Sequence, residues 1–143
     1  MKFNIQQTEL NTALQHLVRN TDNKFFADIK ITTIGSKLIL QATNGEVSME
    51  YRLQADTTNT DTILINARKF TDIVSRLSGD ITFDDGVIKA GKSKLKIDLN
   101  RDEGYQFINK AYFDHNFKEE PITFDIKELQ TGIKNRLFAC DTL

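Results

Sequence analysis

The sequence is poor in the residues that mark exported, disulfide-bonded or membrane proteins. Its 143 residues include no tryptophan, one proline (Pro121) and one cysteine (Cys140). A single cysteine excludes an internal disulfide and is typical of a reducing compartment. No apolar run approaches the roughly 20 residues that a membrane helix needs, and the first residues lack the apolar segment of a signal peptide. We therefore expect a cytoplasmic protein with no membrane contact.

Excess positive charge is also absent. Lysine and arginine total 19 and aspartate and glutamate total 20, which gives a net charge of −1. Proteins that bind DNA by neutralising many phosphates are usually basic. The composition therefore indicates either no role with nucleic acid or a light contact through one local face.

Catalytic motifs are missing as well. The sequence has no glycine-rich phosphate loop, no paired CxxC and no HExxH. His16 and His115 are isolated from each other and from Cys140, so we interpret all three as ordinary structural or surface residues. Three acidic pairs lie in predicted turns: Asp84-Asp85, Asp102-Glu103 and Glu119-Glu120. Solvated turn carboxylates explain such pairs more simply than metal ligands do. We expect no catalytic residue, no metal site and no cofactor.

Two segments have the spacing of amphipathic helices, in which apolar residues recur every three or four positions. The apolar positions are Leu10, Ala13, Leu14, Leu17 and Val18 in the first segment, and Phe70, Ile73, Val74 and Leu77 in the second. We expect Thr8 to cap the start of the first helix. For the second helix, we expect Asn66 to cap the start and Gly79 to close the end.

Short segments with strand-like alternation surround the two helices, and turn residues separate them. The expected strands are 3–5, 26–33, 37–42, 46–53, 63–65, 80–83, 87–90 and 94–99. Apolar residues on one face of 46–53 are Val47, Met49, Tyr51 and Leu53. Both helices need an apolar surface on which to bury their stripes. We therefore expect an α+β fold with two amphipathic helices packed on an antiparallel sheet.

The strand–helix opening of the chain recurs near its end. Phe3 to Ile5 leads into the first helix, and Ile122 to Ile126 leads into a helix-patterned segment that carries Leu129, Gly132, Ile133 and Leu137. Such a recurrence indicates a modular protein. We expect one domain at 1–120 and the incomplete beginning of a second at 121–143.

One cluster of like charge stands out. Lys89, Lys92, Lys94 and Lys96 fall in and around the last predicted hairpin. Edge lysines can block aggregation, bind phosphate or meet an acidic partner edge across a continuing sheet. The residues alone leave these three interpretations open.

Four segments, in their order and spacing, point to a known family. They are 1–5, 38–44, 65–74 and 88–95, of which Ala67-Arg68-Lys69-Phe70 and Gly91-Lys92-Ser93-Lys94-Leu95 are the most specific. Together they resemble the N-terminal domain of the bacterial sliding clamp, the β subunit of DNA polymerase III. The resemblance covers about residues 1–120, and residues 122–143 resemble the beginning of that family's second domain.

The resemblance implies a DNA-clamp fold and a non-catalytic role. In that family, two chains of repeated domains close head to tail into a homodimeric ring around duplex DNA. The ring tethers the replicative polymerase and makes it processive, without reading the DNA sequence, and a clamp loader acts on it. It is a subunit of the polymerase holoenzyme that catalyses no reaction itself.

The resemblance also assigns roles to residues. The polar faces of the two helices, with Gln15, Arg19, Arg68 and Arg76, would contact DNA weakly and without sequence preference. Lys24 is the nearest match to a basic residue that contacts DNA in the loop after the family's first helix. The last hairpin strand corresponds to the family's dimer edge. There, Lys69, Lys92 and Lys94 would face acidic partners and Leu95 would be the apolar anchor.

The sequence also departs from the family pattern. The segments Lys24–Ile29 and Tyr105–Phe107 lack the prolines usual there, which suggests a divergent member such as one from a phage or mobile element. At this length the chain cannot close the family's ring, so we expect a fragment. The alternative is a clamp-like interaction module, a decoy or adaptor that binds a clamp or replication protein through its edge strand. A third class, a nuclease, would need carboxylates such as Asp84, Asp85 and Asp98 to converge on a metal.

Overall fold

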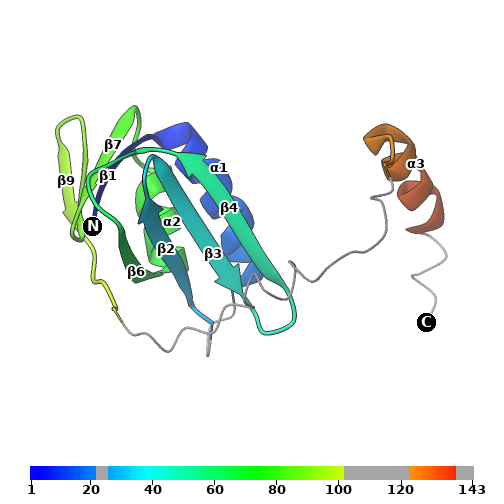
Figure 1. Ribbon diagram of the computed structural model, residues 1–143, viewed down its shortest axis with the longest axis horizontal. Helices are drawn as coiled ribbons and strands as arrows, with labels where there is room; N and C mark the ends of the chain where they lie inside the picture. The colour runs from blue at the N-terminus through cyan, green and yellow to red at the C-terminus, as the bar shows by residue number, and fades with distance from the viewer. Residues whose placement is uncertain (22–25, 102–122, 138–143) are drawn as a thin grey trace. The chain divides into compact units, whose positions relative to one another are not determined.

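The computed structural model describes residues 1–21, 26–101 and 123–137. The chain divides into two units, Met1–Ile108 and Asn109–Leu143, and each is described by itself (Figure 1). Several residues singled out in the sequence lie outside the described residues: Lys24, His115, Cys140, Pro121 and the acidic pairs at 102–103 and 119–120.

The described part of the first unit consists of two short α-helices and a 3-10 helix set among short strands. Its elements are β1 (Lys2–Gln6), α1 (Gln7–Leu17), the 3-10 helix η1 (Val18–Asn20), β2 (Asp28–Ile34), β3 (Lys37–Thr43), β4 (Ser48–Gln54), β5 (Asp56–Thr57), β6 (Asp61–Asn66), α2 (Ala67–Ser75), β7 (Asp80–Asp84), β8 (Val87–Ala90) and β9 (Ser93–Lys96). The described part of the second unit contains α3 (Ile126–Leu137). None of the described helices has the length and apolar content needed to cross a bilayer.

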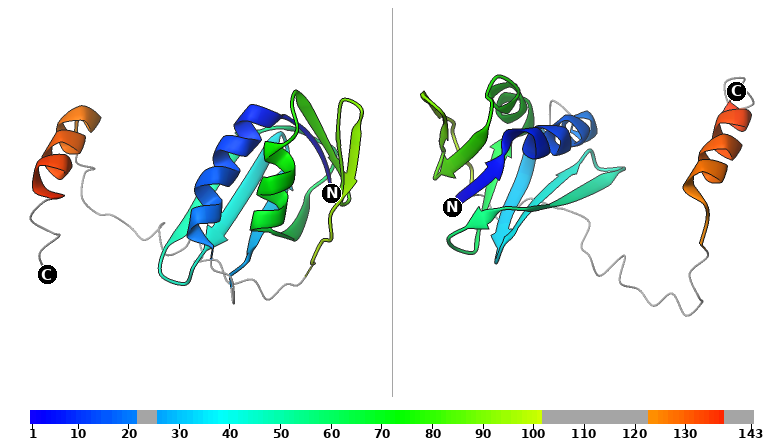
Figure 2. Two further views of the ribbon diagram at one scale, coloured as in Figure 1. Left: turned by 180° about the vertical axis from the view of Figure 1, so that it is seen from behind. Right: turned by 90° about the horizontal axis from the view of Figure 1, so that it is seen from above.

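The strands form two antiparallel sheets where the sequence predicted one. The orders are β5-β1-β7-β8-β9 and β4-β3-β2-β6. The chain passes from one sheet to the other at Ala55, whose amide still donates to the Ser36 carbonyl oxygen at 3.0 Å. Figure 2 shows α1 and α2 side by side over one face of the sheets. The predicted α+β class with two helices on antiparallel strands is confirmed, and the split into two sheets is added by the structure.

The core lies between the helix layer and the sheets. Of the five apolar residues expected in the first helix, four lie in α1 and are at most 1% exposed, and the fifth, Val18, lies in η1 and is half-buried; the four are Leu10, Ala13, Leu14 and Leu17. Phe3 pairs directly with Phe83 across β1 and β7, and their rings stack with centroids 4.9 Å apart. Phe70 of α2 meets Phe83 edge to face at 6.2 Å. One aromatic cluster therefore joins α2 to the five-stranded sheet.

Two of the three predicted helix ends are wrong. Thr8 is not an N-cap, because α1 begins at Gln7 directly after β1 and the Gln7 amide donates to the Gly79 carbonyl oxygen at 3.0 Å instead. Asn66 caps α2 as predicted, since its side chain accepts from the Lys69 amide at 3.1 Å. Gly79 does not close α2, which ends at Ser75. Instead, Gly79 has a positive φ of 76° and turns the chain into β7.

The strands differ from prediction mainly at their ends. β4 begins at Ser48, so Val47 belongs to the preceding turn and is 50% exposed instead of facing inward. That turn contains Gly45 at a φ of 92°, as its Asn-Gly pair predicted. Residues 123–125 are not in a strand, which contradicts the described part of the strand expected at 122–126. The Asp125 carboxylate instead accepts from the amides of Lys127 and Glu128 at the start of α3.

Candidate nucleic-acid interface and partner edge

The two helices of the first unit run antiparallel. At the start of α1, the Gln7 side-chain amide donates to the Val74 carbonyl oxygen at 2.9 Å, near the end of α2. At the other end of the pair, η1 contacts α2. Because each helix buries its apolar stripe in the core, the opposite faces of both helices form one polar, solvent-exposed layer.

Three residues predicted to contact DNA lie on this layer. Gln15, Arg19 and Arg68 are all exposed. Because the helices are antiparallel, Arg19 in η1, directly after α1, and Arg68 at the start of α2 lie at the same end of the layer. Neither arginine forms an ion pair with another described residue. The exposed acidic residues of the two helices are Glu9 and Asp72, so the layer is only weakly positive.

Two other residues of the helices lie apart from this pair of arginines. His16 is directed toward the four-stranded sheet, where Nδ1 hydrogen-bonds the Tyr51 hydroxyl of β4. This contact agrees with the prediction of an ordinary histidine. Arg76 follows the last residue of α2, at the opposite end of that helix from Arg68. It lines a groove next to β9, so the structure separates it from Arg19 and Arg68.

Strand β9 is a free edge of the five-stranded sheet. Among the described strands it pairs only with β8, and all four of its residues are exposed. Leu95 pairs with Ile88, which in turn pairs with the buried Phe83. Leu95 therefore lies on the helix-facing side of the sheet, yet 41% of it remains exposed. An exposed leucine on a free strand edge is the kind of feature that a partner strand covers.

The lysines of the last hairpin lie mostly on the other face of the sheet. Lys94 pairs directly with Lys89, and like charges at directly opposite positions are destabilising. Lys89, Lys92 and Lys94 make no ion pair with another described residue. An acidic partner or a phosphate at this edge would relieve the repulsion. The exposed Leu95 beside the lysines favours the partner-edge interpretation of the cluster.

A groove separates β9 from α2. It has a volume of about 610 Å³ and is lined by Asn66, Lys69, Asp72, Ile73, Arg76, Leu95, Lys96, Ile97 and Asp98. Its apolar lining is Ile73, Leu95 and Ile97. The charged lining has three basic residues and two acidic ones: Lys69, Arg76, Lys96, Asp72 and Asp98. Ile73 belongs to the predicted apolar stripe of the second helix and Ile97 lies in the expected strand 94–99, and neither pattern by itself indicates a groove. The position of Ile73 at the border of the apolar stripe of α2 was the available signal.

The carboxylates that a nuclease would need do not converge. Asp84 pairs with Lys2 at 3.8 Å, and Asp85 pairs with Arg101 at 2.6 Å. Asp98 lines the groove beside α2. Within the described residues, no group of three histidine, cysteine or acidic side chains is placed to hold a metal ion.

Comparison with solved structures supports the resemblance found in the sequence. The beta subunit of the DNA polymerase of Streptococcus pyogenes is 23% identical, with a TM-score of 0.80 over 93% of this chain and 38% of that one. Caulobacter crescentus pol III beta is 21% identical, with a TM-score of 0.80 over 94% and 38%. The Helicobacter pylori beta clamp is 25% identical, with a TM-score of 0.65 over 87% and 33%.

The chain spans 38% or less of the length of these relatives. Comparison with curated protein sequences gave no match. A family model described as "DNA polymerase III beta subunit, N-terminal domain" matches residues 1–109, and the chain therefore belongs to the DNA polymerase III beta subunit family.

Proposed function

We propose that this chain supplies the N-terminal unit of a sliding clamp, a processivity factor that encircles duplex DNA and tethers a replicative polymerase. The family match over residues 1–109 is the observation that carries the proposal. The clamp role requires no catalytic residue in this unit. A clamp loader and the polymerase would be its other partners.

The helix layer suits a contact that must slide. Arg19 and Arg68 provide positive charge without an ion pair inside the described fold, and Gln15 adds a neutral hydrogen-bonding group. Such groups attract phosphates but read no base, so they fix no register on the DNA. Enclosure by a ring would supply the retention that these few charges do not.

The DNA contact can be tested on the 143-residue chain by NMR. Titration with a short duplex of random sequence at low salt should shift the amide resonances around Gln15, Arg19 and Arg68. The Arg19→Ala/Arg68→Ala variant should lose these shifts. Arg52→Ala is the matched control, because Arg52 is similarly exposed on β4 and pairs with Glu50 at 2.5 Å. Shifts that persist in the double variant, or that centre on the sheets, would overturn the DNA face.

The β9 edge suits the junction of a homodimeric ring. A partner strand there would extend the five-stranded sheet, place acidic side chains near Lys92 and Lys94, and cover Leu95. Lys69 lines the same groove from α2. In the longest natural chain that carries this unit, Leu95→Asp should convert dimer to monomer in analytical ultracentrifugation. Val47→Asp, which changes an apolar residue that is 50% exposed in a turn, should not.

A second candidate function rests on the same free edge. A single unit of this kind could cap the complementary edge of another clamp and act as a decoy or adaptor. Mixing the 143-residue chain with a bacterial clamp should then give a complex that Leu95→Asp abolishes and Val47→Asp preserves. Failure to detect a complex at tens of micromolar would eliminate this candidate and leave the ring proposal standing.

A further inference from the structure

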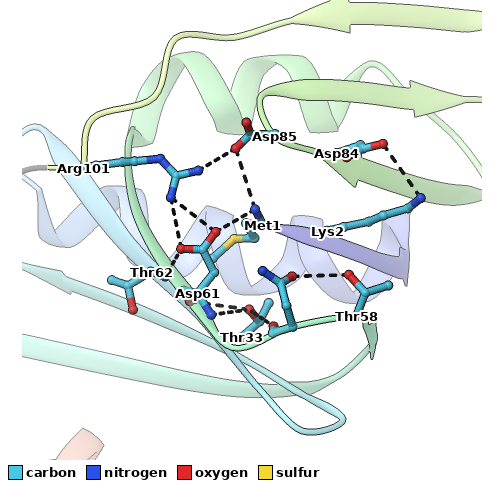
Figure 3. A network of polar contacts seen from close by, with 10 residues as sticks. Met1, Lys2, Thr33, Thr58, Asp61, Thr62, Asp84, Asp85 and Arg101 are labelled. Carbon is cyan, nitrogen blue, oxygen red and sulfur yellow. Dashed lines mark hydrogen bonds and ion pairs between the residues drawn. The ribbon is translucent and has the colours of Figure 1, made fainter.

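A network of charged groups joins the two sheets beyond the end of β9 (Figure 3). Arg101 donates through Nη1 to both carboxylate oxygens of Asp61, at 3.1 and 3.3 Å, and through Nη2 to Asp85 at 2.6 Å. Asp61 opens β6 of the four-stranded sheet, whereas Asp85 lies in the β7–β8 turn of the five-stranded sheet. One guanidinium therefore bridges a carboxylate from each sheet.

The N-terminus of the first strand completes the network. The Met1 ammonium lies 2.6 Å from Asp61 Oδ2 and 3.7 Å from Asp85 Oδ1, and the Asp85 amide donates to the Met1 carbonyl oxygen at 2.9 Å. Two carboxylates thus alternate with two cations. The arrangement orients all four groups more strictly than a single surface pair would.

The segment 97–101, called the crossing segment here, leads from β9 to this network. Its first amide, Ile97, donates to the Gly86 carbonyl oxygen at 2.8 Å, on the five-stranded sheet. Further along, Asn100 and Leu64 exchange two backbone hydrogen bonds of 2.7 and 2.9 Å on the four-stranded sheet. Arg101 then reaches back to both sheets. The crossing segment is therefore fixed at its two ends.

The crossing segment also forms part of the groove. Ile97 and Asp98 line it together with Leu95. Because β9 has only β8 as a described neighbour, the β8–β9 pairing alone does not fix how far β9 stands from α2. The attachment of the crossing segment supplies the missing constraint.

We propose that Arg101 is a positioning residue for the β9 edge. Its ion pairs with Asp61 and Asp85, called the clasp below, hold this edge at a fixed distance from α2. The proposal rests on the proposed function of β9 as a partner edge. Arginine suits this role because its planar fork reaches two carboxylates at once, which a lysine ammonium does less well. Arg101 and Asp85 are 53% and 63% exposed, so solvent and salt screen the clasp. Its effect should therefore be local.

Amide hydrogen exchange of the 143-residue chain tests the clasp without any partner. In Arg101→Ala, the amides of Ile97 and Asn100 should exchange about tenfold faster, while the Ala55 amide, where the chain crosses from β4 to β5, keeps its rate. The exchange rates in Arg101→Lys should lie between those of the natural chain and those of Arg101→Ala. Arg52→Ala should leave the rates at Ile97 and Asn100 unchanged. Unchanged exchange at Ile97 and Asn100, or a uniform rise over the whole unit, would overturn the proposal.

A double-mutant comparison separates the clasp from simple loss of a side chain. If Arg101 acts through Asp85, then Arg101→Ala/Asp85→Ala should exchange no faster at Ile97 than Arg101→Ala alone. Salt near 1 M should accelerate exchange at Ile97 in the natural chain and leave Arg101→Ala unaffected. Additive effects of the two substitutions would contradict the clasp.

The partner role of the edge is measured separately. If Leu95→Asp abolishes association, Arg101→Ala should weaken it severalfold at low salt and leave it unchanged at high salt. Association that withstands Arg101→Ala while Leu95→Asp abolishes it would refute the positioning role. Association that withstands Leu95→Asp would instead refute the proposed partner edge.

Discussion

At the scale of single residues, Asp61 is the carboxylate whose charge the fold uses most directly. A hydrogen bond from the Met1 ammonium is the largest influence and lowers its pKa below the ordinary value of 3.8. Partial burial opposes this shift, while the Thr62 amide and the positive charge of Arg101 reinforce it. The folded state therefore binds a proton at Asp61 less readily than the unfolded chain does.

The sign of the pH dependence follows from that shift. A carboxylate with a depressed folded pKa stabilises the fold above its unfolded pKa, and this contribution is lost as the pH falls through the folded value. Asp61→Asn should therefore lower the free energy of unfolding at pH 7, and the difference from the natural chain should shrink below about pH 4. Urea unfolding between pH 3 and pH 7 measures it. A difference that stays constant over this range would contradict the assignment.

At the scale of elements, the starts of α1 and α2 show when the local sequence is sufficient to predict a helix cap. Asn66 satisfies the Lys69 amide, whereas α1 satisfies its first amide through Gly79 of a distant turn. Asn66→Ala should therefore cost about 1 kcal/mol of unfolding free energy. Thr8→Ala is the matched control and should cost nothing, because Thr8 caps no helix and alanine favours the helical state. Equal losses in the two variants would contradict the capping assignment, and thermal unfolding can measure both.

The same contrast explains how much of the molecule the sequence could predict. The buried stripe of α1, the Asn66 cap and the α+β class depend on local spacing, and the structure confirms them. The split into two sheets depends on which strands pair, and β5 is a strand of two residues with no pattern of its own. The network around Arg101 joins partners that lie 16 and 40 residues away. No local pattern marks such contacts.

The roles expected for the candidate site residues stay predictions, because the structure gives only their positions and exposure. Motif resemblance placed Arg68, Lys94 and Leu95 in functional roles, and all three are exposed in the structure. The groove was not predictable, because Ile73 and Ile97 have the spacing of core residues. Ile97 is indeed buried at 7% exposure, and the groove depends on the separation of β9 from α2. Lys24 lies outside the described residues, so its role stays a prediction.

At the scale of the whole molecule, a nearly neutral net charge is compatible with the proposed DNA-facing role only on one condition. Something other than electrostatic affinity must keep the protein on the DNA. The chain carries 19 basic and 20 acidic residues, and several basic ones lie at the β9 edge or in the Arg101 network. Few cations remain for phosphates on the helix layer. A protein that relied on charge alone to stay on DNA would need many more.

The salt dependence of DNA binding tests this argument. Each phosphate neutralised adds about −0.9 to the slope of log K against log salt, so Arg19, Arg68 and at most one further cation predict a slope between about −2 and −3. Arg19→Ala should reduce the slope by about one, because it would remove the proposed phosphate contact of an exposed side chain. NMR titration of the chain with a short duplex at several salt concentrations measures the slope. A slope of about −6 or steeper would mean that the chain neutralises many phosphates. The proposed enclosure of DNA by a ring would then not be needed to keep the chain on DNA.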